Sequence, residues 1–200
     1  MKEYQESQIK EMAEDFQQGA VIAFPTDTVY GVGSIYGDLD ALNRLKMIKH
    51  RPETKPIPMM ASRLETYAPY VKLSPMAQKI ADAFLPGPLT LIVELTAFAN
   101  RDFFNGKSTA AIRIPNAPTL LKVMDCLDRP LMVSSANVSG EPAALTKQEA
   151  MAMLKELDGI LDGTCHELQA STIVDCTQDK PKILREGPIT LAQIEVALEK

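Results

Sequence analysis

Histidine, cysteine and tryptophan are scarce in this sequence of 200 residues, which contains two, three and none of them, respectively. His166 and Glu167 begin a His-Glu-x-x-His zinc motif, but Ala170 stands where the second histidine would be. The three cysteines form no Cys-x-x-Cys pair, so neither a disulfide framework nor a zinc site is expected. We therefore predict no resident metal. The chemistry is expected to come from Lys, Arg, Ser, Thr, Asn and Asp and from the groups of a ligand.

The sequence also lacks long apolar runs and an excess of positive charge. No run approaches the ~20 apolar residues of a membrane span, and residues 1–15 carry five acidic side chains and no apolar signal-peptide core. We therefore expect no membrane contact and a cytoplasmic location with reduced thiols. The 21 basic and 26 acidic side chains give a net charge of −5, which argues against binding nucleic acid by bulk charge.

Hydrophobic residues recur with helical and strand-like spacing in alternating segments. The expected helices cover residues 3–18, 38–50, 74–84, 118–126, 146–157 and 190–198, and Asp38 or Asp40 can cap the second of them. The expected strands cover residues 20–24, 57–60, 89–95, 109–114, 130–134, 171–176 and 181–185. This alternation predicts an α/β fold on a mixed parallel and antiparallel sheet, as one domain over residues 1–200.

A basic segment stands out against the negative net charge, because residues 44–55 contain five Lys or Arg and a single acid. Lys46 and Lys49 lie near the predicted end of a helix, where the helix dipole favours cations. Arg51 and Lys55 follow that helix in a stretch held by two prolines. Cations on a stiff loop lose little conformational entropy on binding a phosphate. The segment is therefore either a solvated surface or a phosphate-binding loop.

Two further arginines, Arg113 and Arg185, stand inside apolar runs that are typical of strands. A guanidinium in such a run either points to solvent or requires a nearby anion, because burying its charge alone is costly. For a lone arginine, an outward-facing position is the common explanation. Two such strands, together with the loop that carries Arg51 and Lys55, favour convergence of these side chains on one anionic ligand.

Short polar side chains follow or open three of the expected strands. Residues 24–31 contain two Thr, an Asp and a Tyr, residues 134–140 contain three Ser and an Asn, and residues 171–175 begin with two hydroxyls. Loops at strand ends of an α/β sheet often carry ligands, although the same residue types also form turns and helix caps. Without a Gly-x-Ser-x-Gly motif or a suitable histidine, we interpret these hydroxyls as binding or capping groups rather than nucleophiles.

Seven segments, in this order, resemble motifs of the YrdC-type L-threonylcarbamoyl-AMP synthase family over about residues 20–187. They are residues 25–31, 49–52 with 55–56, 86–90, 111–115, 135–140, 171–175 and 183–185. The resemblance is to the short, single-domain form of the family. It implies a twisted mixed sheet with surrounding helices and a concave, basic cavity, which agrees with the convergence of cations expected above.

The resemblance implies an enzyme that condenses L-threonine, bicarbonate and ATP, with Mg²⁺ on the ATP phosphates, into threonylcarbamoyl-AMP and pyrophosphate. A separate transferase complex would then move the threonylcarbamoyl group to N6 of adenosine 37 in tRNAs that read ANN codons. Catalytic roles are implied for Lys49 and Arg51, which would hold the triphosphate. The other implied contacts are with ATP through Arg51, Lys55, Thr109, Ser135, Asn137 and Arg185, and with threonine through Thr28, Arg113 and Ser171.

Two departures from the family pattern lie near the implied site. Met60 stands near a position where some members have a threonine-contacting His. Glu186 replaces the usual proline after Arg185, so its carboxylate must point away from the phosphates. The alternatives are a non-catalytic RNA-binding module that uses the same basic cavity, and a nucleotide hydrolase. The 6% aromatic content and the absence of Trp argue against RNA binding by base stacking, so the RNA-binding module is the weaker alternative. A weak tRNA contact of the enzyme stays compatible with this composition.

Overall fold

The computed structural model describes residues 1–52 and 54–199 and confirms a mixed α/β fold. The strands are β1 (Lys2–Tyr4), β2 (Ile22–Phe24), β3 (Gly31–Ile35), β4 (Met59–Met60), β5 (Val71–Lys72), β6 (Leu89–Leu95), β7 (Thr109–Arg113), β8 (Leu131–Ser135), β9 (Gly159–Leu161), β10 (Thr172–Asp175) and β11 (Lys182–Arg185). The helices are α1 (Ile9–Gln17), α2 (Leu39–Ile48), α3 (Pro75–Phe84), α4 (Pro118–Asp125), α5 (Lys147–Met153) and α6 (Leu191–Leu198), with short 3₁₀ helices η1 (Leu64–Tyr67) and η2 (Arg101–Phe104).

The eleven strands of the described residues form one sheet in the order β1-β9-β2-β3-β8-β4-β7-β6-β10-β11, with β5 paired to β6. The pairs β1–β9, β2–β9, β4–β7 and β6–β10 are parallel, and the other neighbours are antiparallel. Segments from both halves of the chain are therefore interleaved. The predicted mixed sheet is confirmed, and that the whole chain folds as one domain stays a prediction.

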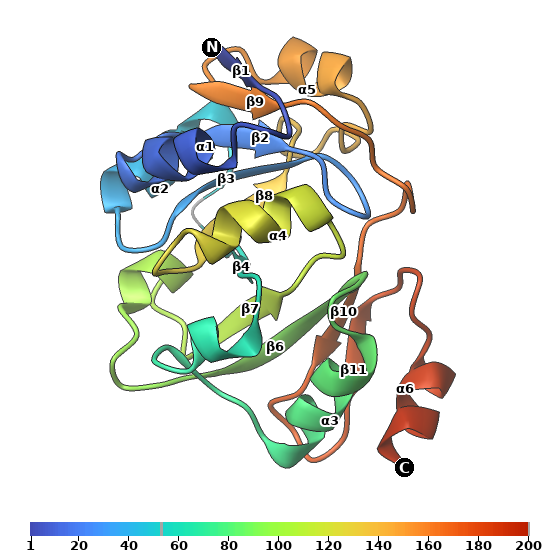
Figure 1. Cartoon of the computed structure of the whole chain (residues 1–200). Helices are drawn as coiled ribbons and strands as arrows, with labels where there is room; N and C mark the ends of the chain where they lie inside the picture. Colours follow the sequence, from blue (N-terminus) through green and yellow to red (C-terminus); the bar gives the residue numbers. More distant parts are fainter. Residues whose placement is uncertain (53, 200) are drawn as a thin grey trace.

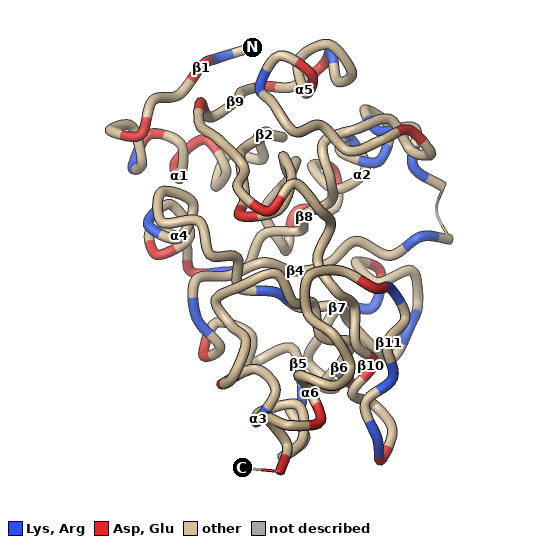
Figure 2. Tube along the Cα trace, turned by 90° about the vertical axis from the view of Figure 1, so that its right-hand side faces the viewer, with Lys and Arg blue, Asp and Glu red and all other residues tan. Residues whose placement is uncertain are grey.

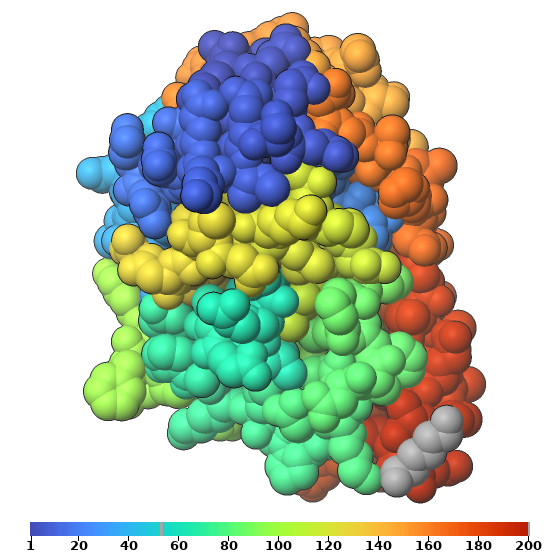
Figure 3. All heavy atoms as spheres, viewed as in Figure 1, coloured from blue at the N-terminus to red at the C-terminus, as the bar shows by residue number. Residues whose placement is uncertain are grey.

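Strand alternation divides the apolar residues between the two faces of the sheet. Ile22 and Phe24 of β2 join one core cluster, whereas Ala23 of β2 and Val21, directly before the strand, join the other. The first cluster includes Phe16 of α1 and residues of α4, and these two helices lie side by side in front of the sheet (Figure 1). Their side chains form a continuous cover on this side of the molecule (Figure 3). The second, larger cluster contains buried residues of α2, α3, α5 and α6.

Helix starts follow the caps encoded in the sequence. The Asp38 carboxylate accepts a hydrogen bond from the backbone N–H of Ala41 at 2.9 Å, so Asp38 rather than Asp40 caps α2. The Ser74 hydroxyl accepts from Ala77 N–H at 3.1 Å, directly before a proline in the first turn of α3. Both caps satisfy N–H groups that have no partner inside the helix.

Four strands, β1, β3, β5 and β9, were missing from the sequence prediction, and each is short or rich in glycine. Residues 2–4 form the edge strand β1, so the first helix begins at Ile9 and not at residue 3. The predicted helix over residues 146–157 ends at Met153 and is followed by β9. In β3, a Cβ on Gly31 would lie 3.0 Å from the Phe24 ring. The close packing between β2, β3 and β8 therefore favours glycine, which hid the strand from the hydrophobic pattern.

Charged residues are spread over the chain rather than separated into basic and acidic halves. Figure 2 shows Lys and Arg interspersed with Asp and Glu along the whole trace. Within residues 1–52 and 54–199, no helix is both long enough and apolar enough to cross a membrane. Any local gathering of arginines is therefore a feature of the fold and not of a generally basic region.

The two aspartates at the start of α2 give a test of the cap assignment. Asp38→Ala removes the acceptor for Ala41 N–H and is expected to lower the free energy of unfolding by about 1 kcal/mol. Asp40→Ala is the matched control, because the exposed Asp40 side chain has no hydrogen bond or ion pair with the described residues and interacts with the helix dipole, an effect of about 0.3 kcal/mol. Urea unfolding of both variants measures the difference. Equal losses would contradict the assignment of Asp38 as the cap.

Candidate active site

A cavity of about 410 Å³ lies on one face of the sheet. Its lining residues belong to strands and loops, and none of them belongs to a helix. Alternate residues of three neighbouring strands line it: Thr90 and Ile92 of β6, Ala111 and Arg113 of β7, and Ile173 of β10. The residues between them belong to the larger core on the other face. One strand pattern therefore builds the core and the cavity at the same time.

Arg113 is the most deeply buried charge in the cavity wall, with 4% of its surface exposed. Its guanidinium donates to Asp27 Oδ1 at 2.5 Å, to Thr28 Oγ1 at 2.9 Å and to the Gly87 carbonyl at 3.2 Å. Burial lowers the pKa of Arg113, and Asp27 opposes this shift, so the group stays protonated. These contacts use three of its five N–H groups. One N–H on each terminal nitrogen remains for a ligand, the arrangement that suits a carboxylate.

Arg185 and Ser171 form a second polar group in the wall. The Arg185 guanidinium donates to the Ser171 carbonyl at 3.0 and 2.8 Å and to Ser171 Oγ at 3.1 Å. Partial burial lowers the pKa of Arg185. Its other terminal nitrogen has no hydrogen bond to the described residues, so it can meet an anion in the cavity. Glu186 is exposed and does not line the cavity, as required beside a phosphate ligand.

The loop after α2 holds Arg51 in the wall through its own backbone. Arg51 Nε donates to the Lys55 carbonyl at 3.1 Å, and a terminal nitrogen donates to the Pro56 carbonyl at 2.8 Å. The other terminal nitrogen donates to Ser134 Oγ of β8 at 3.3 Å. Burial lowers the pKa of Arg51. The proline-stiffened loop therefore orients this guanidinium before any ligand arrives.

Lys49 lies behind the cavity wall rather than in it. Only 1% of its surface is exposed, and its ammonium group donates to the carbonyls of Ser135 and Asn137, the latter at 2.6 Å. The side-chain oxygen of Asn137 accepts from Ser135 Oγ at 2.5 Å and lies 3.4 Å from Lys49 Nζ. Burial and the nearby Arg51 charge lower the pKa of Lys49 to about 7. Lys49 therefore braces the turn that presents Ser135 and Asn137 to the cavity.

Seven of the ten site residues expected from the sequence line this one cavity: Thr28, Arg51, Arg113, Ser135, Asn137, Ser171 and Arg185. Lys49, Lys55 and Thr109 do not line it. Lys55 is exposed, and Thr109 lies on β7 two residues before Ala111, on the same face. Their contacts with ATP stay predictions, as do the roles of the other seven.

Sequence reasoning assigned no role to one wall residue of chemical interest, Thr90, and counted Ser134 only among hydroxyls that bind a ligand or form a cap. Thr90 lies in one of the motifs that carried the family resemblance, and it stands at a cavity-facing position of β6. The alternation of β6 was the signal that could have found it. Met60 of β4 also lines the cavity, beside Arg113 in the paired strand β7.

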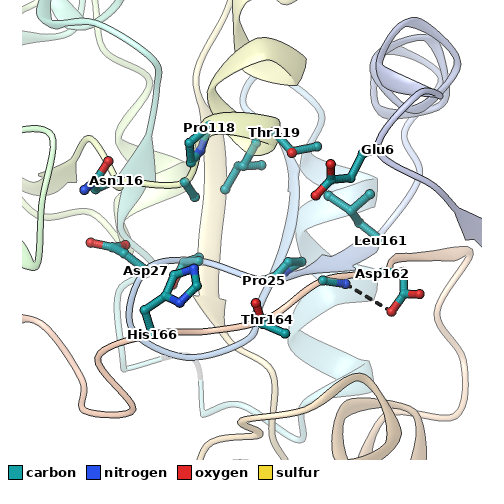
Figure 4. Close-up of a pocket in the computed structure, with 14 residues that line it drawn as sticks. Glu6, Pro25, Asp27, Asn116, Pro118, Thr119, Leu161, Asp162, Thr164 and His166 are labelled. Atoms are coloured by element: carbon teal, nitrogen blue, oxygen red, sulfur yellow. Dashed lines mark hydrogen bonds between the residues drawn. The ribbon is translucent and has the colours of Figure 1, made fainter.

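A second, smaller cavity of about 110 Å³ adjoins the loop that holds Asp27. Asp27, His166 and Asn116 surround it together with Glu6 and Asp162 (Figure 4). Thr26 lines both cavities, so this loop forms part of the wall between them. The second oxygen of Asp27 is buried and has no hydrogen-bond partner among the described residues.

The groups in the larger cavity are suited to binding and positioning anions. Three arginines and the hydroxyls of Thr28, Thr90, Ser135 and Ser171 line it, with Glu141 as an acidic lining residue. Neither His nor Cys is found among the lining residues. Within the part of the chain that the structure describes, no three His, Cys, Asp or Glu side chains are placed to hold a metal ion. Such a wall favours reactions driven by positioning and electrostatic stabilisation of ligand charges.

Comparison with known families and sequences agrees with this geometry. The family model Sua5_yciO_yrdC, described as "Telomere recombination", matches residues 14–187. A Mycobacterium leprae relative is 37% identical over 183 residues, which are 90% of this chain and 83% of that protein. The threonylcarbamoyl-AMP synthases of Pyrococcus abyssi and Bacillus subtilis are 32% and 34% identical over 96% of this chain. The chain spans only 57% and 56% of the lengths of these two relatives.

Solved structures show the same fold. P. abyssi Sua5 complexed with L-threonine superposes with a TM-score of 0.92 at 30% identity, covering 98% of this chain and 60% of that one. E. coli YciO superposes with a TM-score of 0.87 over 96% of this chain and 98% of its own. At 23% identity, this second match shows the fold alone.

Buried Lys49 predicts a pH dependence of stability. Its pKa of about 7 in the folded protein lies below its ordinary value of 10.5. Between these values the unfolded chain holds more protons, so the free energy of unfolding rises with pH, and below about pH 7 this contribution is lost. From pH 7 to pH 9 we expect Lys49 to add about 2 kcal/mol. Urea unfolding of the wild type and Lys49→Met measures it, and equal pH slopes in both proteins would exclude the lowered pKa.

Proposed function

The chain belongs to the Sua5/YciO/YrdC family, and we propose that it is a threonylcarbamoyl-AMP synthase. The observation that carries this proposal is the meeting of Arg51, Arg113 and Arg185, from distant parts of the sequence, in one cavity. Relatives named for this activity and a P. abyssi Sua5 complex with L-threonine support it. The substrates are L-threonine, bicarbonate and ATP, and the products are threonylcarbamoyl-AMP and pyrophosphate.

Each arginine has a role that follows from its surroundings. Arg113 clamps the threonine carboxylate through its two remaining N–H groups, beside Thr28 and near Ser171. Arg51 and Arg185 bind the ATP phosphates, where a guanidinium matches two phosphate oxygens at once. Magnesium enters as part of the substrate MgATP, because Mg²⁺ is commonly bound largely through substrate phosphates.

The remaining expected contacts are secondary in this scheme. Ser135 and Asn137 contact the nucleotide or the intermediate from the turn that Lys49 braces. Lys49 contributes to catalysis by holding this turn. Lys55 and Thr109 contact ATP once it fills the cavity, since they lie just outside its present lining.

The reaction needs no nucleophile from the protein. The threonine amine attacks bicarbonate, forming a carbamate with loss of water. A carbamate oxygen then attacks the α-phosphorus of ATP, and the bond to the β-phosphate oxygen breaks to release pyrophosphate. Charge builds on the phosphoryl oxygens and the leaving group, where fixed guanidinium groups stabilise it. The two histidines and the absence of His and Cys from the lining are compatible with this chemistry.

The product is a mixed anhydride that must be consumed by a second enzyme. A separate threonylcarbamoyl-transferase complex takes it and modifies N6 of adenosine 37 in tRNAs that read ANN codons. In this scheme the protein acts in the cytoplasm, and any tRNA contact of its own is weak. The net charge of −5 supports this last point, because bulk attraction to RNA is absent.

Pyrophosphate release from MgATP tests the function directly. We expect release only when L-threonine and bicarbonate are both present, because the carbamate is the attacking group. Omission of either substrate is the internal control. Phosphate release that does not depend on threonine would identify a nucleotide hydrolase. Tight tRNA binding without pyrophosphate release would identify an RNA-binding module.

The role of Arg113 predicts a selective loss of threonine binding. Arg113→Lys keeps a positive charge but loses the two-pronged contact with a carboxylate. The threonine KM is expected to rise about tenfold or more, with a smaller change in the KM for ATP. Arg63→Lys is the matched control, since Arg63 forms a surface ion pair with Asp125 at 3.1 Å. An unchanged threonine KM in Arg113→Lys would remove Arg113 from the threonine subsite.

A further inference from the structure

Thr90 lies in the cavity wall with its hydroxyl against Ser171, although no role was assigned to it above. Only 3% of its surface is exposed, and its Oγ1 lies 2.9 Å from Ser171 Oγ. Among the described residues, this is the only hydrogen bond of the Thr90 hydroxyl. A buried hydroxyl on a rigid strand with one partner is placed to control that partner's orientation.

The Ser171 hydroxyl has one donor and two acceptor positions, and its neighbours determine where its proton points. Arg185 donates one hydrogen bond to Ser171 Oγ at 3.1 Å, which occupies one of the two acceptor positions of that oxygen. When Thr90 donates to the second position, the hydroxyl proton of Ser171 must point elsewhere, and the cavity that Ser171 lines is the remaining direction. Either hydroxyl of this pair can be the donor, and with Thr90 as the donor Ser171 is directed as a donor towards an acceptor oxygen of a bound ligand.

The backbone makes this arrangement rigid. Thr90 pairs with Ile173 in the parallel ladder between β6 and β10, and Thr172 N–H donates to the Pro88 carbonyl at 3.0 Å. Directly before Pro88, the Gly87 carbonyl accepts a hydrogen bond from Arg113 Nε at 3.2 Å. The stretch from residue 87 to residue 90 therefore touches both proposed threonine contacts, Arg113 at one end and Ser171 at the other.

We propose that Thr90 is a positioning residue of the L-threonine subsite, which acts through Ser171 by directing its hydroxyl proton towards the substrate. The inference rests on the proposed function and deepens it. It assigns a part in substrate recognition to β6, where the side chain of Thr90 sets the donor direction, and to the turn before it, where the backbone of Gly87 holds the guanidinium of Arg113.

Thr90→Val tests the proposal, because valine has nearly the same shape and lacks the hydroxyl. We expect the threonine KM to rise about tenfold, the loss of one oriented hydrogen bond, while kcat changes less than about threefold. Thr90→Ser restores the hydroxyl and is expected to keep the threonine KM within about twofold of the wild type. Thr90→Ala replaces Thr90→Val if the valine variant does not fold.

A neighbouring threonine is the matched control. Thr172 is fully buried, and its hydroxyl donates to the Ile189 carbonyl at 2.7 Å and accepts from Ile189 N–H, away from the cavity. Thr172→Val is expected to lower the melting temperature and leave the threonine KM unchanged. An equal rise in KM for Thr172→Val and Thr90→Val would overturn the proposal, because loosening of β10 would then explain both.

A double-mutant cycle separates action through Ser171 from direct contact. In a Ser171→Ala background, Thr90→Val is expected to cause no further rise in the threonine KM, because the group it orients is gone. Independent, multiplicative effects would overturn the proposal, as would a normal threonine KM in Thr90→Val or a failure of Thr90→Ser to rescue. These outcomes are read in a wild-type background that releases pyrophosphate with threonine. Absence of that release is instead the failure of the proposed function.

Discussion

The buried charge of Arg113 is the constraint on which the site depends. A guanidinium removed from water is stable only when its N–H groups find partners of suitable charge and geometry. Its partners come from separate parts of the chain: Asp27 and Thr28 from the loop after β2, and the carbonyl of Gly87 from the turn before β6. Satisfying one side chain therefore fixes three segments relative to each other, and two of them, the loop with Thr28 and the strand β7, line the cavity.

The other two arginines follow the same rule with backbone carbonyls in place of a carboxylate. Arg51 is held by Lys55 and Pro56, and Arg185 by Ser171. Carbonyl groups orient a guanidinium without neutralising its charge. The positive charge therefore remains available to a ligand, and no side chain must be reordered when the ligand binds. Fixed donors of this kind are the main source of electrostatic stabilisation in charged transition states.

The features that the sequence predicted are those determined by residues close together in the chain, and the features that it missed depend on long-range packing. Helix caps such as Ser74, and strands such as β6 with clear alternation, were predicted because short-range chemistry determines them. The gathering of Arg51, Arg113 and Arg185 was expected, because two arginines in apolar runs and a third on a stiff basic loop favoured convergence on one anionic ligand. The strand β3 was missed because the fit of Gly31 against Phe24 is visible only after the strands pair. Lys49 was expected to touch ATP, but its burial behind Ser135 depends on the same long-range packing.

The strand period links stability to function in this fold. In β6, β7 and β10, one set of alternate residues fills the larger core, and the other set lines the cavity. A shift of one residue in β6 would turn Thr90 into the core and Leu91 towards the cavity, and in β7 it would exchange Arg113 and Ile112 in the same way. The apolar residues therefore hold the register that the polar residues need. The driving force for folding is also what keeps the arginines and hydroxyls directed into one cavity, although those groups contribute little burial energy themselves.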